Sequence, residues 1–384
     1  MGLVQDAELL PGIDAHPHAR AILAPALRER GGASHAYLFH GPSGTGKRAT
    51  ARAFAAALLA DGAEQAQSVR ERIARGTHPD LTWVRPSGAA EMLVSDIEEP
   101  VVAAATRTPF ESARRVFVIE AADTMNDQAA NRMLKTLEEP ADYVHLLLLT
   151  DRREDVLATI ASRCQLVRFD PLPPQRIAAG LEGSPTSTPA ELAQACARLA
   201  LGDADLAARL ASEQGTPLRA AAEGFARGAL AGASGERRWL EMLDAAKAAG
   251  VQAGERAQAS MADELELVPS KERKKHEREG LEARRRGERR ARTQGLDLML
   301  GLAELWLRDV LCVCEGAAEL IYAVDRVEQL QEDARDRSPE GVREAIEAVQ
   351  GTRLRLSLNV AEELALEALA YRLEALLAAE PVGG

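Results

Sequence analysis

The sequence predicts an α/β domain with a parallel sheet at the N-terminus, followed by domains made of helices. Short apolar runs rich in β-forming residues alternate with longer helical patterns through the first part of the chain, which is typical of strands covered by helices on both faces. Beyond about residue 175 no convincing strand pattern remains. The expected strands are residues 36–39, 81–84, 116–119, 144–149 and 166–169, and the clearest helical patterns are residues 49–59 and 127–137.

A chain of 384 residues is too long for one typical core, so more than one domain is expected. The proline cluster at residues 171–174 ends the α/β domain, because proline continues neither a sheet ladder nor a helix interior. Residues 228–235 read as a glycine/alanine linker between helical parts. The predicted domains are residues 1–172, 173–232 and 233–384.

The composition argues against several classes of protein. Aromatic residues make up only 3% of the chain, which disfavours an all-β sandwich and aromatic platforms for single-stranded nucleic acid. A net charge of -12 argues against a protein that coats DNA over its whole surface. The segment 270–294 is nevertheless net basic. It fits either a phosphate-binding surface or an exposed helix laced with salt bridges, and the second interpretation is favoured.

The four cysteines are Cys164, Cys196, Cys312 and Cys314. A C-x-C pair alone is neither a zinc site nor a redox motif, so free thiols in a reducing compartment are expected. The N-terminal residues lack the basic start and apolar run of a signal peptide, and no apolar run reaches the roughly 20 residues that span a bilayer. We therefore expect a cytoplasmic protein with no membrane partner.

The clearest motif is G-P-S-G-T-G-K at residues 41–47, which follows a predicted strand and opens a predicted helix. In such a P-loop the glycines let successive backbone N–H groups point at phosphate oxygens, while the helix N-terminus and the lysine supply positive potential. The motif predicts nucleotide binding, with ATP or ADP as possible ligands. The candidate nucleotide-binding residues are Gly41, Ser43, Gly44, Thr45, Gly46, Lys47 and Arg48.

Two features around this motif argue against ATP hydrolysis. The hydroxyl residue that normally follows the lysine and ligates Mg²⁺ is replaced by Arg48, and a guanidinium cannot ligate a metal. The predicted strand at 116–119 is followed by Glu120, a possible metal-side acid, but the next residue is Ala121, where a base would be needed. Mg²⁺ binding is therefore doubtful, and we expect the chain's own ATPase activity to be weak or absent.

Further motifs follow the P-loop in a fixed order. Residues 119–126 read I-E-A-A-D-T-M-N, and residues 129–140 end in L-K-T-L-E-E-P. They are followed by S-R-C at 162–164 and W-L-R-D at 306–309. This set resembles the AAA+ subunits of bacterial DNA polymerase III clamp loaders. The resemblance implies a P-loop (AAA+) α/β domain, a small helical lid and an all-α C-terminal collar domain that serves oligomerisation.

Within that family the residues resemble the delta-prime type, a stator, more than the gamma/tau type, a motor ATPase. The zinc-binding cysteines common in the family are absent between residues 61 and 79, so no zinc or other metal is expected. A sensor arginine is expected after Gly202, but Asp203 stands there. A gamma/tau-type clamp-loader ATPase is the alternative, and a P-loop switch unrelated to replication is a third hypothesis.

The resemblance also implies that Arg163 is an arginine finger acting in trans, which reaches the γ-phosphate bound by a neighbouring motor subunit. The simpler interpretation is that Arg163 pairs with a carboxylate. Thr150 occupies the place of a sensor residue at the end of a predicted strand. The implied partners are gamma/tau-type and delta-type clamp-loader subunits, with the sliding clamp and primed DNA reached through the complex.

Overall fold

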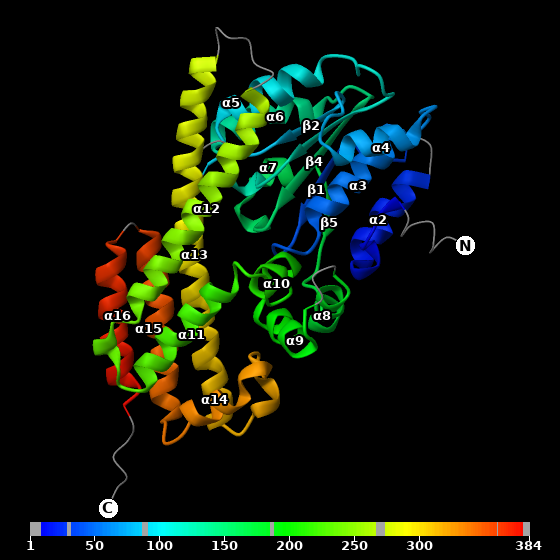
Figure 1. Cartoon of the computed structure of the whole chain (residues 1–384). Helices are drawn as coiled ribbons and strands as arrows, with labels where there is room; N and C mark the ends of the chain where they lie inside the picture. The colour runs from blue at the N-terminus through cyan, green and yellow to red at the C-terminus, as the bar shows by residue number, and fades with distance from the viewer. Residues whose placement is uncertain are drawn as a thin grey trace, which may run out of the picture. The chain divides into compact units, whose positions relative to one another are not determined.

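The structure is a computed structural model that describes residues 9–28, 32–86, 91–184, 188–265, 273–358 and 360–378 (Figure 1). The chain divides into two compact units. The first unit comprises Met1–Pro173 with Gly202–Asp205, and the second comprises Pro174–Leu201 with Leu206–Gly384. The three-part division expected from the sequence, with a separate lid at residues 173–232, stays a prediction.

The first unit is built on a five-stranded parallel sheet with the strand order β2-β3-β4-β1-β5 (Figure 1). All five expected strands are confirmed, with ends that differ by no more than one residue. The P-loop α/β class predicted for the N-terminal domain is thus confirmed as well. The strands are β1 (Ala36–His40), β2 (Leu81–Val84), β3 (Arg115–Ile119), β4 (Val144–Thr150) and β5 (Gln165–Arg168).

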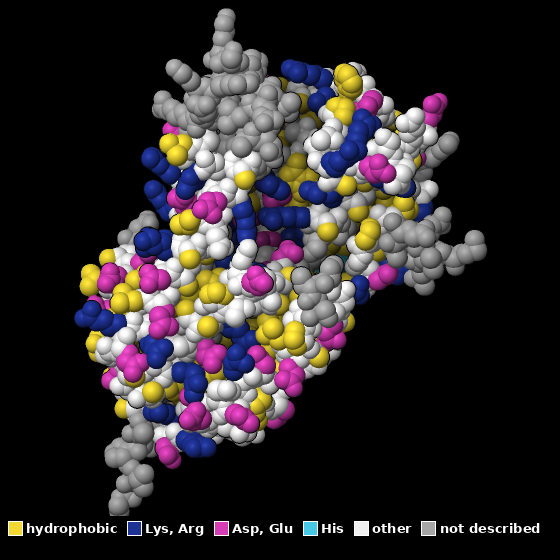
Figure 2. Space-filling view, in the orientation of Figure 1, with side chains coloured by type: hydrophobic (Ala, Val, Ile, Leu, Met, Phe, Trp, Pro, Cys, Tyr) yellow, Lys and Arg dark blue, Asp and Glu magenta, His cyan; other side chains and the backbone are white. Residues whose placement is uncertain are grey.

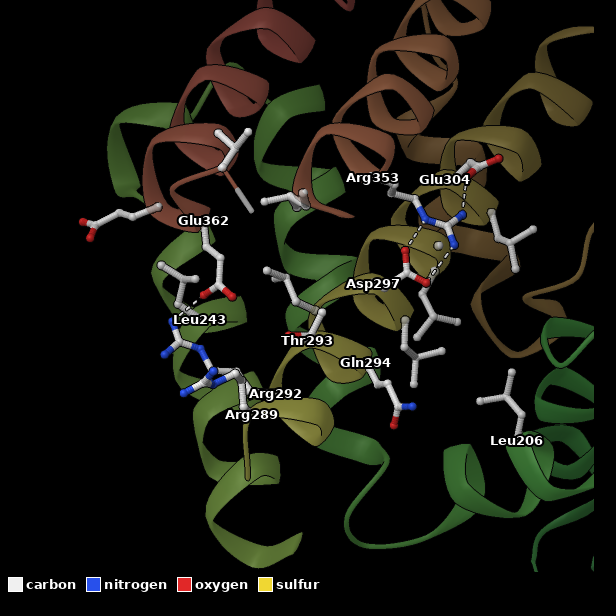
Figure 3. Close-up of a pocket in the computed structure, with 18 of the residues that line it drawn as sticks. Leu206, Leu243, Arg289, Arg292, Thr293, Gln294, Asp297, Glu304, Arg353 and Glu362 are labelled. Carbon is white, nitrogen blue, oxygen red and sulfur yellow. Dashed lines mark hydrogen bonds and ion pairs between the residues drawn. The ribbon is translucent and has the colours of Figure 1, made fainter. Parts of the chain in front are cut away.

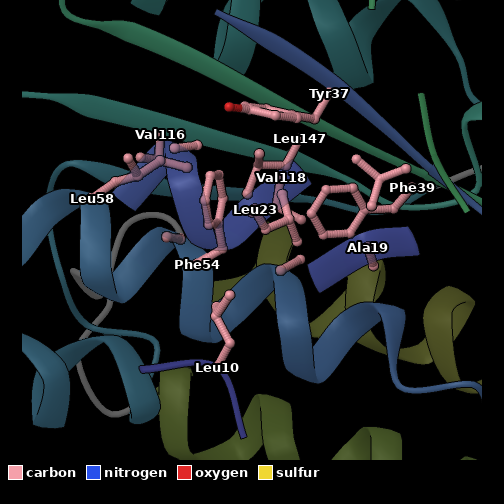
Figure 4. Packing of buried hydrophobic residues seen from close by; sticks show 14 of the residues in the cluster. Leu10, Ala19, Leu23, Tyr37, Phe39, Phe54, Leu58, Val116, Val118 and Leu147 are labelled. Atoms are coloured by element: carbon pink, nitrogen blue, oxygen red, sulfur yellow. The ribbon is translucent and has the colours of Figure 1, made fainter. Parts of the chain in front are cut away.

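Helices cover both faces of this sheet, so each face has its own core. On one face, Tyr37 and Phe39 of β1 pack with Leu23 and Phe54 from two helices (Figure 4). Leu38, between them in the strand, belongs to the core of the opposite face. Burial on both faces explains why the strand sequences show unbroken apolar runs instead of alternation. The helices of this unit are α2 (Pro17–Arg28), α3 (Lys47–Ala60), α4 (Ala66–Ala74), α5 (Val94–Ile97), α6 (Asp127–Glu138) and α7 (Ala158–Ala161).

The second unit contains only helices among its described residues. Residues 228–235, expected to be a linker, instead continue a helix to Leu230, which is a correction. Ala226, Ala229 and Leu230 are buried on one face of that helix, and this burial outweighs the low helix propensity of Gly228. The helices are α8 (Pro174–Glu182), α9 (Ala190–Leu199), α10 (Ala204–Ala211), α11 (Thr216–Leu230), α12 (Trp239–Leu265), α13 (Arg273–Cys314), α14 (Val327–Asp333), α15 (Pro339–Ser357) and α16 (Glu362–Leu376).

The W-L-R-D motif lies in α13 and connects this helix to α14 and to residues 322–323. Trp306 is buried and donates its indole N–H to Asp333 over 2.9 Å. Asp309 is fully buried and accepts the backbone N–H groups of Tyr322 and Ala323 at 2.8–3.0 Å. These bonds satisfy a carboxylate that would otherwise be costly to bury, so the motif is structural. Among the described residues, no helix is long and apolar enough to cross a membrane.

The two cores of the first unit predict a large difference between buried and exposed phenylalanines. Phe54 is fully buried, whereas Phe110 is 84% exposed. Phe54→Ala is expected to lower the free energy of unfolding of this unit by about 3–5 kcal/mol, because it leaves a cavity between α3 and the sheet. The matched control Phe110→Ala is expected to change it by less than about 0.5 kcal/mol. Urea denaturation followed by circular dichroism measures both, and similar losses would contradict the assigned core.

Candidate nucleotide site and its surroundings

The P-loop connects the end of β1 to the start of α3, at the edge of the sheet where the parallel strands have their carboxyl ends. Gly41 adopts a φ of 142°, and a Cβ there would lie 2.0 Å from the carbonyl oxygen of Phe169. Only glycine fits that approach to the segment after β5. Thr45 is buried and donates its hydroxyl to the carbonyl of Pro42 over 2.8 Å, which closes the turn from within. The loop has the fold that the motif predicts.

Lys47, the P-loop lysine, is only 6% exposed and is surrounded by oxygen atoms of the protein itself. Its Nζ donates to the carbonyls of Gly41 and Pro42 over 2.6 and 2.5 Å. It also forms an ion pair with Asp151, 2.7 Å away. An ammonium group has three donors, so these three partners use all of them. Lys47 could bind a phosphate only by giving up some of these contacts.

Asp203 places a carboxylate against the same loop. Ser43 donates its hydroxyl to Asp203, and the backbone N–H of Ala204 donates to the carbonyl of Gly44 over 3.1 Å. The contact is so close that a Cβ on Gly44 would lie 1.7 Å from an oxygen of Asp203. The loop that would cradle phosphate oxygens therefore faces an anionic group of the protein. Repulsion between that carboxylate and a nucleotide phosphate opposes binding.

Glu120 lies directly after β3 and is 5% exposed, with three partners around its carboxylate. Arg48, at the start of α3, forms an ion pair with Glu120 over 2.9 Å. Trp83 donates its indole N–H over 2.5 Å, and Arg85 donates over 3.1 Å. The two positions that a Mg²⁺ ion would need are the one after the P-loop lysine and the acid after β3, and here these two residues bind each other instead. This donor set does not fit Mg²⁺, which requires oxygen ligands in an octahedron.

Thr150 ends β4 and is buried. Its hydroxyl lies 2.8 Å from a carboxylate oxygen of Asp123 and accepts the N–H of Arg152 over 3.0 Å. Arg152 forms an ion pair with the same aspartate over 3.0 Å, and this bond raises the pKa of Arg152 above its usual value. Thr150 is therefore held in a local network next to Asp151, and its role as a sensor stays a prediction. Ala121, after Glu120, has a φ of 52° and supplies no proton acceptor.

Arg163 follows α7 on the surface of the first unit, with its side chain 35% exposed. It forms an ion pair with Glu138 at the end of α6 over 2.5 Å and donates to the carbonyl of Thr159 over 2.9 Å. The L-E-E-P and S-R-C motifs, about 25 residues apart in the chain, therefore meet in space. Burial raises the pKa of the neighbouring Cys164 thiol to about 12, so this cysteine stays protonated and anchors the turn as an apolar residue.

The structure thus brings Lys47, Arg48 and Glu120 together at one edge of the sheet and places Arg163 in a separate cluster. Sequence reasoning missed Asp151, Trp83 and Arg85 as partners of this site. Asp151 directly follows β4, and the carboxyl ends of parallel strands share an edge, so its position could have revealed it. All four cysteines are free, and no cluster of metal-ligating side chains is found within the part of the chain that the structure describes.

Part of the chain is similar in sequence to known proteins. The family model for "DNA polymerase III, delta subunit" matches residues 16–173. The chain is 40% identical over 150 residues to DNA polymerase III subunit delta' of Bacillus subtilis, which covers 38% of this chain and 44% of that protein. It is 36% identical over 212 residues to subunit delta' of Pseudomonas aeruginosa, which covers 54% of this chain and 60% of that protein. The N-terminal module is therefore similar to that of delta-prime clamp-loader subunits.

Other matches are weaker. Subunit tau of Bacillus subtilis is 34% identical over 145 residues, which cover 36% of this chain and 24% of that protein. A gamma subunit-related protein of DNA polymerase III from Thermotoga maritima is 18% identical and covers 93% of this chain and 99% of its own, with a TM-score of 0.42. That score is too low for a shared overall arrangement to follow. The chain spans about half the length of the delta-prime relatives it matches, 44% and 60%.

The carboxylate of Asp203 predicts how nucleotide affinity can be changed. Asp203→Ala is expected to strengthen ADP binding by about tenfold, or about 1.4 kcal/mol, because it removes a negative charge from the phosphate loop. Asp205→Ala is the matched control, since Asp205 is exposed and lies two residues away. Isothermal titration calorimetry with ADP measures both variants. Equal affinity of Asp203→Ala and the unaltered chain would contradict the assigned role.

Proposed function

We propose that the chain works as a delta-prime-type stator of a DNA polymerase III clamp loader. In this role it assembles with gamma/tau-type and delta-type subunits in the cytoplasm, and the complex places sliding clamps on primed DNA. The chain contributes a rigid module and the Arg163 side chain to a neighbouring subunit, with little or no ATP turnover of its own. Homology of its N-terminal module to subunits delta' and tau supports these partners.

The single observation that carries the stator proposal is the Arg48–Glu120 ion pair. In a working ATPase a metal ion stands between the residue after the P-loop lysine and an acid at the end of another strand of the same sheet. Here a guanidinium is bound to that acid directly over 2.9 Å. The contacts of Lys47 with Asp151 and of Ser43 with Asp203 further reduce the capacity of the loop to hold a triphosphate. A gamma/tau-type ATPase would need all of these contacts to open.

The surroundings of Arg163 support a role outside the chain's own site. Its partner Glu138 is 48% exposed, and exposed ion pairs typically contribute only about 0–1 kcal/mol. Exchange of Glu138 for a phosphate on another subunit therefore costs little. The two bonds to Glu138 and Thr159 also orient the guanidinium before assembly. An oriented planar guanidinium can bind a γ-phosphate through two donors at once.

The finger proposal predicts a loss of activity that appears only in the assembled loader. The loader is reconstituted with motor subunits whose own finger arginines are substituted, so that only the interface served by Arg163 retains a finger. Arg163→Ala is then expected to slow ATP hydrolysis by on the order of 10³, because charge developing on the transferred phosphate loses its counter-charge. Arg163→Lys is expected to recover only part of this loss, since a lysine lacks the planar fork.

Arg153→Ala is the matched control, because Arg153 is an exposed arginine of the same unit that forms no ion pair with the described residues. It is expected to leave hydrolysis unchanged. Unaltered hydrolysis in the Arg163→Ala loader would contradict the finger proposal. Rapid Mg²⁺-dependent ATP turnover by the isolated chain would contradict the stator proposal and favour the gamma/tau-type alternative.

A further inference from the structure

Helices α12 and α13 form a long helical arm, and residues 280–295 of α13 are net basic. α12 and α13 run antiparallel to each other, since Gly250 lies against Glu288 while Ala246 lies against Gly295 (Figure 1). A Cβ added at Gly250 would lie 2.8 Å from the carbonyl oxygen of Glu288, so the two backbones pack at very short range. Glu288 itself lies in this seam, because its Cγ would be 2.4 Å from a Cβ added at Gly254. The glycines of α12 thus make room for the side of α13 that faces them.

The part of α13 before Leu296 contributes little to the hydrophobic core. Buried apolar side chains begin at Leu296 and continue with Met299 and Leu300. In residues 280–295, Leu281 is the one large apolar residue, and it is 50% exposed. The same sixteen residues contain six arginines and two glutamates, a net charge of +4 on a chain whose total is -12. Core packing thus does not explain the composition of this segment.

Three exposed arginines share one face of the arm. Arg285, Arg289 and Arg292 are spaced by four and three residues, which places them within an arc of about 60° and a length of about 10 Å along the helix. We call these three residues the arginine stripe. Arg289 and Arg292 lie beside each other at the edge of a pocket, with Glu362 opposite (Figure 3). Neighbouring Arg284 is not part of the stripe, because it faces α12 and binds Gln258 and Glu288 over 2.6 and 2.8 Å.

Most of the positive charge of the stripe is not neutralised. Arg285 and Arg289 form no ion pair with any carboxylate that the structure describes, while Arg292 pairs with Glu362. On the face of the helical bundle that Figure 2 shows, basic and acidic side chains are interspersed. An exposed helix stabilised by its own salt bridges would pair these arginines within the helix, as Arg284 and Glu288 do. An exposed helix stabilised by its own salt bridges therefore explains Arg284. It does not explain why Arg285 and Arg289 are arginines.

We propose that the arginine stripe binds the sugar–phosphate backbone of duplex DNA. Exposed guanidinium groups along one face of a helix are suited to bidentate contacts with phosphates, and the release of counterions from DNA drives such binding. Residues 273–305 contain no Phe, Tyr or Trp that could stack on unpaired bases, so the backbone of a duplex is favoured over single strands. The proposal concerns the chain by itself and does not depend on the finger role of Arg163.

The test measures binding of the full-length isolated chain to a fluorescein-labelled duplex by anisotropy over a range of salt concentrations. The triple variant Arg285→Gln/Arg289→Gln/Arg292→Gln is expected to bind at least about tenfold more weakly at low salt. The slope of log K against log salt is expected to fall in magnitude by about 2.7, because three phosphate contacts each contribute about 0.9. Replacement of the same three arginines by lysine keeps the charge and is expected to retain most of the affinity.

The matched control is Arg335→Gln/Arg343→Gln/Arg372→Gln, which removes the same charge from exposed positions of the bundle. It is expected to leave duplex affinity and salt slope unchanged. The proposal is overturned if the stripe variant binds duplex as the unaltered chain does, if the control loses as much, or if a single strand of equal length binds more tightly. Circular dichroism of each variant checks that its helices are retained. ATPase activity is not part of the measurement, so failure here leaves the stator proposal standing.

Discussion

The arrangement around Glu120 controls what the P-loop of this chain can do. The residue lies at the end of β3, buried, and a buried carboxylate is stable only when it is paired and hydrogen-bonded. Trp83, Arg85 and Arg48 supply that compensation from β2, the segment after it and α3. Arg48 is the residue after the P-loop lysine, where an ATPase has a hydroxyl ligand for the metal. The same side chain therefore pairs with Glu120 and takes the place of that hydroxyl. Glu120 is thereby held in an internal ion pair at the position where a P-loop ATPase has its metal-side acid.

Other residues of the P-loop also bind groups of the protein itself. Lys47 binds Asp151 and two carbonyl groups, and Ser43 binds Asp203. These contacts join the P-loop to the end of β4 and to residues 202–205, so the region is held together without a ligand. Such internal contacts support the proposed stator role. Arg163 lies in a different cluster, and its exposed pair with Glu138 can exchange partners without disturbing the closed loop.

The strands of the sheet and the P-loop could be predicted from the sequence. The strands were predictable because parallel strands buried on both faces appear as short apolar runs. Weak or absent ATP hydrolysis, inferred from Arg48 and Ala121, stays a prediction. The partners of these residues were less accessible, since Asp151 and Trp83 reach the loop only through the order of strands in the sheet. Gly228 was misleading, because a local preference against helix was outweighed by the burial of Ala229 and Leu230. The pair of Arg163 with Glu138 required knowledge of where α6 and α7 end relative to each other.

The account depends on the Arg48–Glu120 ion pair standing where a metal ion would otherwise bind, and the response of nucleotide affinity to Mg²⁺ tests this most directly. Calorimetric titration of the isolated chain with ADP, with and without Mg²⁺, gives the two affinities. The account predicts equal affinities, because no oxygen ligand is available to couple the metal to the phosphates. Restoration of the hydroxyl by Arg48→Thr is expected to make binding respond to Mg²⁺. A clear strengthening of ADP binding by Mg²⁺ in the unaltered chain would contradict the account.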